Sequence, residues 1–175
     1  MNIRSGSDDG KNGYKLFKDK LATVPIDDDS PAYLFYCEGD NCIEQSTVGY
    51  YVNDKDDVYS CKTSGSEVKC SEVNIETSCT SQTIGKIFYE NSSEIKYYVC
   101  LDYDGTNAIS VELNENGGDY ITGYSEDNAY GLTSNQYAVV EINKTSVKLK
   151  NISGKFNMFN NYNWNLLYFN IFLFL

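Results

Sequence analysis

Residues 49–73 read GYYVNDKDDVYSCKTSGSEVKCSEV, and this stretch decides how the rest of the chain is interpreted. It contains an apolar run after a glycine, an acidic loop, a Tyr-x-Cys step, a Ser-Gly-Ser turn and a second cysteine. Gly13, Gly49 and Gly85 each open a similar run at a spacing of 36 residues. Such self-similarity at a period of 20–50 residues indicates a repeat array. The sequence therefore predicts repeats near residues 13–48, 49–84, 85–122 and 123–155.

Fainter copies of the Tyr-x-Cys step support this division. They are Tyr36-Cys37, Tyr59-Ser60-Cys61, Tyr98-Val99-Cys100 and residues 137–140, where the cysteine is gone. Alternating strand patterns follow them, and the abundant Tyr, Val, Ile and Thr favour strands. We therefore expect an all-β fold of tandem disulfide-pinned hairpins, each with a further strand, in a solenoid-like stack. A compact β-sandwich is the alternative.

The two ends of the chain depart from the repeats. Residues 1–12 are polar and rich in Gly, Ser and Asp, which predicts a disordered segment. Residues 156–175 form an aberrant apolar tail or a truncated repeat. The continuous apolar part of this tail is much shorter than the roughly 20 residues that span a bilayer, so no membrane span is expected.

Two disulfides follow from hairpin geometry. A two-residue turn at Gly39-Asp40 suits type II′, in which glycine takes the first central position. Counting outward from it places Cys37 opposite Cys42. A turn at Gly65-Ser66 likewise places Cys61 opposite Cys70. Directly opposed positions that are not hydrogen-bonded bring Cα atoms to about 4.5 Å, near the lower end of what a disulfide accepts.

The third pair, Cys79–Cys100, follows only by elimination. When residues 110–113 are laid on residues 70–73, Ser110 takes the place of Cys70, and Cys100 loses its local partner. Longer-range or inter-repeat pairing is the alternative for all three bridges.

Composition excludes several classes of function. The 175-residue chain carries a net charge of −11, whereas binding to a nucleic-acid backbone depends on clustered Lys and Arg. It has no histidine, which removes Ser-His-Asp and Cys-His catalysis and histidine metal ligation. No cofactor motif is present, and the chain is not expected to be an enzyme.

The number of cysteines also indicates the cellular compartment in which the chain folds. Six cysteines, an even number, predict disulfides and an oxidising compartment. Sequons at Asn91, Asn143 and Asn151 predict N-glycosylation. The first residues lack the apolar region of a signal peptide. We therefore expect an extracellular segment of a longer secreted protein, with a cytosolic protein holding reduced cysteines as the alternative.

Tyrosines are the candidate binding residues. Tyr50 and Tyr51 are consecutive in a predicted strand and must face opposite sides of it. One of them is expected to be exposed beside the acidic loop 54–57 and to anchor a partner. That loop and residues 102–107 carry oxygen ligands suited to calcium. They lack a complete ligand set and are read as solvated acidic turns.

The order Gly-aromatic-aromatic-x-Asn, acidic loop, Tyr-x-Cys, turn and Lys-Cys-x-Glu-Val resembles the cysteine-containing repeats of scaffoldins from anaerobic gut fungi. The resemblance is best over residues 33–113, fainter over 139–156 and absent from the tail. It implies a cohesin-like, non-catalytic function in a cellulosome, in which the repeats dock dockerin modules of plant-cell-wall-degrading enzymes. A carbohydrate-binding or cell-wall adhesion module, using exposed tyrosines on polysaccharide, is the alternative.

Overall fold

The computed structural model describes residues 3–5, 12–22, 25–26, 30–53, 55–91 and 95–154, and this part of the chain is all β, with no helix. Its strands are β1 (Ile3–Ser5), β2 (Gly13–Phe17), β3 (Tyr33–Glu38), β4 (Asn41–Gln45), β5 (Gly49–Val52), β6 (Val58–Ser64), β7 (Glu67–Val73), β8 (Ile87–Asn91), β9 (Ile95–Tyr103), β10 (Ala108–Glu112), β11 (Gly118–Thr122), β12 (Gln136–Ile142) and β13 (Ser146–Gly154). β1 lies within the segment that the sequence predicts to be disordered, and the tail from residue 156 lies outside the described residues.

The described residues form four antiparallel three-stranded units in sequence order. They are β2–β4, β5–β7, β8–β10 and β11–β13, here called the first to fourth units. The fourth unit includes β11, which the sequence places at the end of the third repeat. The strands are short and rich in β-branched and aromatic residues, as the composition predicts.

A cross-strand row of three residues recurs at the equivalent position in each of the units. It runs Gly13–Cys37–Cys42 in the first unit, Gly49–Cys61–Cys70 in the second and Gly118–Ile142–Val147 in the fourth. In the third unit the row is Gly85–Cys100–Ser110, and the Gly85 N–H donates to the Cys100 carbonyl at 2.6 Å. The fourth unit therefore carries an Ile–Val pair where the first two carry disulfides.

The units do not stack in chain order, so the predicted solenoid is wrong. β13 of the fourth unit pairs with β5 of the second, with Ser146 opposite Tyr51 and Lys148 opposite Gly49. This pairing joins the two units into a six-stranded sheet of order β11-β12-β13-β5-β6-β7. The second and fourth units thus merge edge to edge, while the first and third units form separate sheets.

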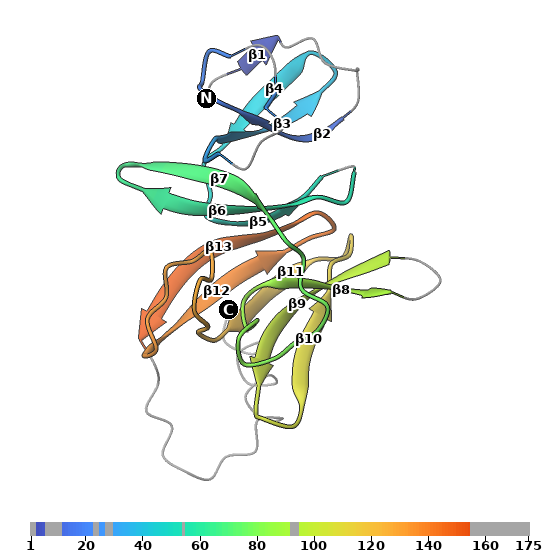
Figure 1. Ribbon diagram of the computed structural model, residues 1–175, viewed down its shortest axis with the longest axis vertical. Coiled ribbons are helices and arrows are strands. Elements are labelled where there is room, and N and C mark those ends of the chain that lie inside the picture. The colour runs from blue at the N-terminus through green and yellow to red at the C-terminus, as the bar shows by residue number, and fades with distance from the viewer. Residues whose placement is uncertain are drawn as a thin grey trace.

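The arrangement is sandwich-like, with the six-stranded sheet in the middle (Figure 1). The four-stranded sheet β1-β4-β3-β2 lies at one end, against the face of β5–β7. The three-stranded sheet β10-β9-β8 lies on the opposite side. Each sheet is antiparallel. Because neighbouring sheets pack face to face, they bury apolar side chains between them.

Two apolar clusters fill the spaces between the sheets. The larger one includes Val58, Val99, Leu101 and Val140 and lies between the middle sheet and the third unit. The second includes Leu16, Leu34, Tyr51 and Cys61 and lies between the middle sheet and the first unit. The middle sheet is therefore buried on both faces around β5 and β6, which explains why every residue of β5 is buried.

Candidate functional site

The aromatic anchor predicted at Tyr50 or Tyr51 is not at the surface. The two side chains do face opposite sides of β5, but Tyr50 is 3% exposed and Tyr51 is fully buried. Tyr50 packs toward the third unit and Tyr51 toward the first. The expectation of an exposed ring was wrong because both faces of this strand are covered by other sheets.

Tyr50 is fixed by contacts from the loop between β11 and β12. The Ala129 N–H donates to its hydroxyl at 3.0 Å, and its ring meets that of Tyr130 edge to face, with centroids 5.8 Å apart. Burial raises the pKa of Tyr50 well above its ordinary value, while the Ala129 N–H and the nearby Ser60 hydroxyl act in the opposite direction. Tyr50 is thus a neutral core residue.

Tyr51 connects the first and second units. Its ring meets that of Tyr14 edge to face at 5.0 Å, and its hydroxyl donates to the Thr47 carbonyl at 2.7 Å. Burial raises its pKa as well. Edge-to-face aromatic pairs of this kind contribute about 0.5–1.5 kcal/mol beyond their buried area. This tyrosine therefore stabilises the packing of the two units.

A groove of about 430 Å³ opens where the first unit meets the turn between β12 and β13. We call it the inter-unit groove. One wall comes from the first sheet, and the other comes from the turn, from β13 and from the loop between β10 and β11. The lining residues are Tyr14, Tyr36, Ile43, Gln45, Glu115, Asn143, Lys144, Thr145 and Lys148.

Two tyrosines form the aromatic part of the inter-unit groove. The rings of Tyr14 and Tyr36 meet edge to face at 5.1 Å. Tyr14 is buried and reaches the opposite wall, where the hydroxyls of Thr145 and Ser146 partly offset the burial that raises its pKa. Tyr36 is half-buried and presents the accessible ring surface.

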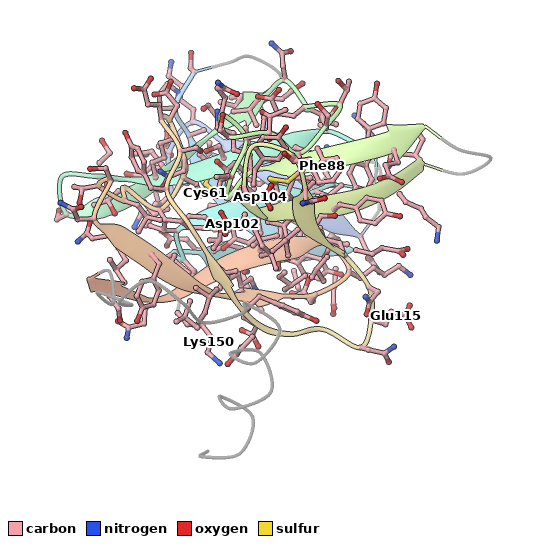
Figure 2. The ribbon with its side chains drawn as sticks, turned by 90° about the horizontal axis from the view of Figure 1, so that it is seen from below. Cys61, Phe88, Asp102, Asp104, Glu115 and Lys150 are labelled. Atoms are coloured by element: carbon pink, nitrogen blue, oxygen red, sulfur yellow. A yellow bond between two sulfur atoms is a disulfide. The ribbon has the colours of Figure 1, made fainter. Side chains whose placement is uncertain are left out.

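The charges of the groove come from one acid and two lysines. Lys144 Nζ lies 2.8 Å from Glu115 Oε1, and both side chains are largely exposed (Glu115 is labelled in Figure 2). This contact raises the pKa of Lys144 and lowers that of Glu115. Lys148 Nζ lies 5.7 Å from the centre of the Tyr51 ring. The lining carries one net positive charge, on a chain whose net charge is −11.

The acidic turns use their oxygens within their own loops. Asp57 Oδ2 accepts from the Asn53 amide group at 2.8 Å, and Asn53 Oδ1 accepts the N–H groups of Lys55 and Asp57, both at 2.8 Å. Asp104 Oδ1 accepts those of Thr106 and Asn107 at 2.8 and 2.7 Å, and these bonds lower its pKa. No group of three or more potential metal-ligating side chains occurs in the described ranges.

The three disulfides join the cysteines that the sequence pairs: Cys37–Cys42, Cys61–Cys70 and Cys79–Cys100. The first two link directly opposed residues with Cα atoms 4.0 Å apart. Gly39 and Gly65, which begin the two turns, have φ of 56° and 64°, as a type II′ turn requires at that position. The local geometry of both hairpins thus follows the sequence.

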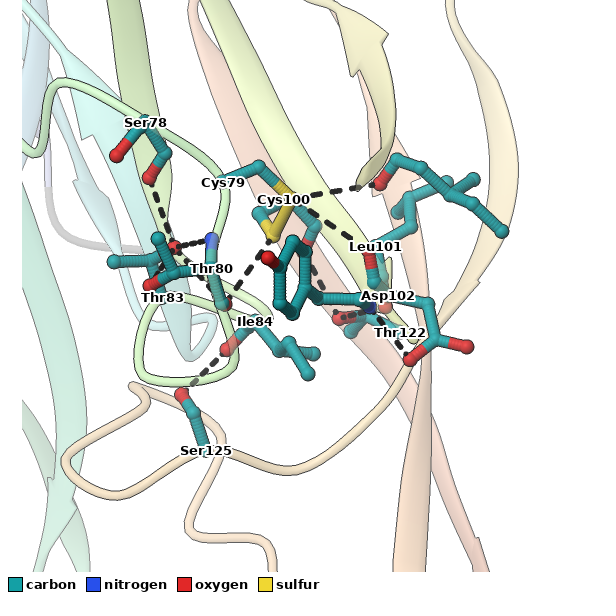
Figure 3. Close-up of a disulfide and its surroundings, with 12 residues drawn as sticks. Ser78, Cys79, Thr80, Thr83, Ile84, Cys100, Leu101, Asp102, Thr122 and Ser125 are labelled. Carbon is teal, nitrogen blue, oxygen red and sulfur yellow. Dashed lines mark hydrogen bonds between the residues drawn. A yellow bond between two sulfur atoms is a disulfide. The ribbon is translucent and has the colours of Figure 1, made fainter. Parts of the chain in front are cut away.

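The third disulfide ties the loop before β8 to the middle of β9 (Figure 3). Hydrogen bonds of Thr83 with Ser78 and Thr80 organise this loop. The Ser125 hydroxyl donates to the Ile84 carbonyl at 2.6 Å and attaches the loop to the segment after β11. The bridge therefore fixes a long connection to the core of the third unit.

The sequons occupy different environments. Asn143 lines the inter-unit groove, and its Oδ1 accepts from Thr145 N and Ser146 Oγ, both at 3.0 Å. Asn151 is exposed on β13. Asn91 is the last residue of β8, and its side chain lies outside the described residues. Glycosylation at the three positions stays a prediction.

Comparison with protein-family models, with curated proteins and with solved structures finds no significant match for this chain. In the described residues, no helix is long and apolar enough to cross a membrane.

Sequence reasoning missed the inter-unit groove. Its walls come from residues far apart in the chain, and Tyr36 and Lys144 show no shared motif. The 36-residue spacing did single out Tyr14, because it follows Gly13 as Tyr50 follows Gly49. This spacing could not indicate which units contact each other and form the groove.

Proposed function

We propose that this chain is a non-catalytic segment of a secreted scaffolding protein that docks dockerin-bearing plant-cell-wall-degrading enzymes. The inter-unit groove is the docking surface. The resemblance of the repeats to gut fungal scaffoldins supports the partner class, and the side-chain composition of the groove supports the choice of surface.

One observation carries the choice of surface. The groove combines a half-buried aromatic ring, Tyr36, with a rim that holds a positive and a negative side chain, Lys144 and Glu115. An aromatic anchor within a polar rim is the usual composition of a protein-binding patch. The two tyrosines favoured by sequence offer no such surface.

The side-chain chemistry supports a non-catalytic function. The chain has no histidine, and all six cysteines are held in disulfides. Nucleophilic catalysis by a Cys-His or Ser-His pair is therefore not available. The three disulfides are also consistent with an extracellular location.

The test measures docking of a purified fungal dockerin module to the full chain by isothermal titration calorimetry. Tyr36→Ala should weaken binding by about tenfold to a hundredfold, the loss typical of a hot-spot aromatic residue. Lys144→Ala should weaken it less, because an exposed charge contributes little. Tyr89→Ala, a half-buried tyrosine on β8 in the third unit, is the matched control and should leave docking unchanged.

A polysaccharide is the second candidate partner of the same groove. The amide groups of Gln45 and Asn143 flank the aromatic residues, and rings beside hydrogen-bonding side chains also suit a sugar chain. Retention of the same variants on insoluble cellulose and on xylan separates the candidates. If Tyr36→Ala abolishes polysaccharide retention and no dockerin binds the unmodified chain, the docking proposal is wrong.

A further inference from the structure

A separate cavity of about 170 Å³ lies on the opposite face of the middle sheet from the inter-unit groove. It lies between β6 and β7 on one side and the start of β8 on the other. Its inner wall consists of buried side chains, among them Tyr50, Val58 and Ile87. Its mouth is formed by Lys62, Asn74, Glu76, Lys86 and Asp127. The cavity is thus apolar inside and polar at its opening.

The inner wall contains one hydroxyl that has no hydrogen bond. Ser60 is 4% exposed, and no partner for its Oγ occurs in the part of the chain that the structure describes. Ser60 stands opposite Tyr50 in the β5–β6 pair, on the same face. Ser60 Oγ lies near enough to the Tyr50 hydroxyl to lower the pKa of that tyrosine, but the two hydroxyls do not reach hydrogen-bond geometry. The Tyr50 hydroxyl already accepts from the Ala129 N–H. A buried hydroxyl left without a partner costs about 1–3 kcal/mol.

The charges at the mouth balance. Lys62 Nζ donates to the Asp127 carbonyl at 3.2 Å, and Lys86 Nζ lies 4.0 Å from Glu76 Oε1. Two lysines thus face two acidic residues around the opening. An ion entering the apolar interior would lose its hydration without gaining a counter-charge. The site therefore selects against a net charge on its occupant.

We propose that this cavity is a binding site for a small neutral polyol or monosaccharide, one hydroxyl of which forms a hydrogen bond with Ser60. A cavity of about 150 Å³ holds a molecule the size of benzene, so this one, at about 170 Å³, encloses about seven non-hydrogen atoms, which is a six-membered sugar ring and one of its hydroxyls. A sugar hydroxyl both donates and accepts, which matches a serine in either orientation. The C–H groups of the ring contact Val58 and Ile87, and the outer hydroxyls meet the polar mouth. The site is independent of the docking proposal.

Titration of the ¹⁵N-labelled full chain with D-xylose, followed by amide chemical shifts, tests the proposal. Saturable shifts at Tyr50, Ser60 and Ile87 are expected, with a dissociation constant in the millimolar range. Ser60→Ala should weaken binding by about tenfold, the effect of one lost hydrogen bond. Ser71→Ala is the matched control, because Ser71 stands opposite Ser60 on β7 but does not line the cavity. Sodium acetate should cause no saturable shift.

A second variant keeps the test decisive if Ser60→Ala folds poorly. Asn74→Ala changes an exposed residue at the mouth and should also weaken xylose binding, by about threefold to tenfold. Three results would overturn the proposal: no saturable xylose shift at the cavity, equal xylose affinity in Ser60→Ala, or binding of toluene in place of xylose. Docking at the inter-unit groove is tested by Tyr36→Ala, so the two proposals fail separately.

Discussion

Ser110 stands directly opposite Cys100 in the β9–β10 hairpin, in the place that a bridged cysteine occupies in the first two units. Cys100 pairs instead with Cys79, 21 residues earlier in the chain. The third unit therefore retains the geometry of the local bridge but uses its cysteine to hold a long loop.

This geometry predicts that the bridge can be moved. In a Cys79→Ser/Ser110→Cys variant, position 110 should bridge to Cys100, as non-reducing peptide mapping would detect. The loop closed would shrink from 21 to about ten residues, which lowers the stabilisation by about 0.7 kcal/mol in the chain-entropy model. Cys79→Ser alone should lose about 2–4 kcal/mol. A double variant no more stable than this single one would contradict the prediction.

Gly49 is required by the pairing of β5 with β13. A Cβ at this position would lie 2.1 Å from the Val147 carbonyl oxygen, and its φ of 151° disfavours other residues. Gly49→Ala should therefore destabilise the fold by more than about 3 kcal/mol in urea unfolding. Gly65→Ala, at a turn glycine with open space around it, should cost only about 1–2 kcal/mol. Equal losses would mean that the close strand contact is not essential.

The two buried tyrosines should differ in their response to loss of the hydroxyl. Tyr50→Phe leaves the buried Ala129 N–H without its acceptor, which costs about 1–3 kcal/mol. Tyr51→Phe removes only a donor to the Thr47 carbonyl, which is partly accessible to water, and should cost about 0.5–1.5 kcal/mol. Chemical denaturation measures both. A larger loss for Tyr51→Phe would contradict the assignment of their environments.

Acid should weaken the contact between the first and second units. Tyr33 donates to Glu67 at 2.6 Å, and Lys20 lies 3.4 Å from the same carboxylate, so the pKa of Glu67 is lowered. A lowered pKa in the folded state means that stabilisation is complete above the unfolded-state pKa and is lost as the pH falls through the folded value. Urea unfolding between about pH 6 and pH 3 should therefore show a smaller decline in Glu67→Gln than in the unmodified chain.

Glu126→Gln, at an exposed loop position, is the charge-matched control. It should follow the acid profile of the unmodified chain. If stability declines with acid as much in Glu67→Gln as in the unmodified chain and in Glu126→Gln, the Tyr33–Glu67–Lys20 contacts do not account for the acid sensitivity.

The sequence was sufficient to predict local geometry. It correctly predicted the all-β class and the two disulfides within hairpins, Cys37–Cys42 and Cys61–Cys70. The two-residue turns at Gly39 and Gly65 fix the register of their strands, so counting outward is enough to pair the cysteines. In the fourth unit, where no cysteine marks the row, the sequence comparison aligned residues 137–140 with the Tyr-x-Cys step. The structure places Ile142 there instead.

Long-range packing could not be predicted in the same way. Period-two alternation shows that Tyr50 and Tyr51 face opposite sides, but not that both sides are covered. The first and third units pack against the two faces of β5. At its edge, β5 pairs with β13. The inter-unit groove depends on the same non-local pairing, which leaves no motif within any one repeat.

The pairing of β13 with β5 also sets the order of events during synthesis. A ribosome exposes β5 early, but the strand that flanks it in the finished sheet emerges only when the fourth unit has been translated. Until then the nascent second unit keeps an open edge, and such edges readily pair with foreign strands. Contacts between distant segments also slow folding. The middle sheet therefore closes only after β13 has emerged, and the edge of β5 stays exposed during the interval.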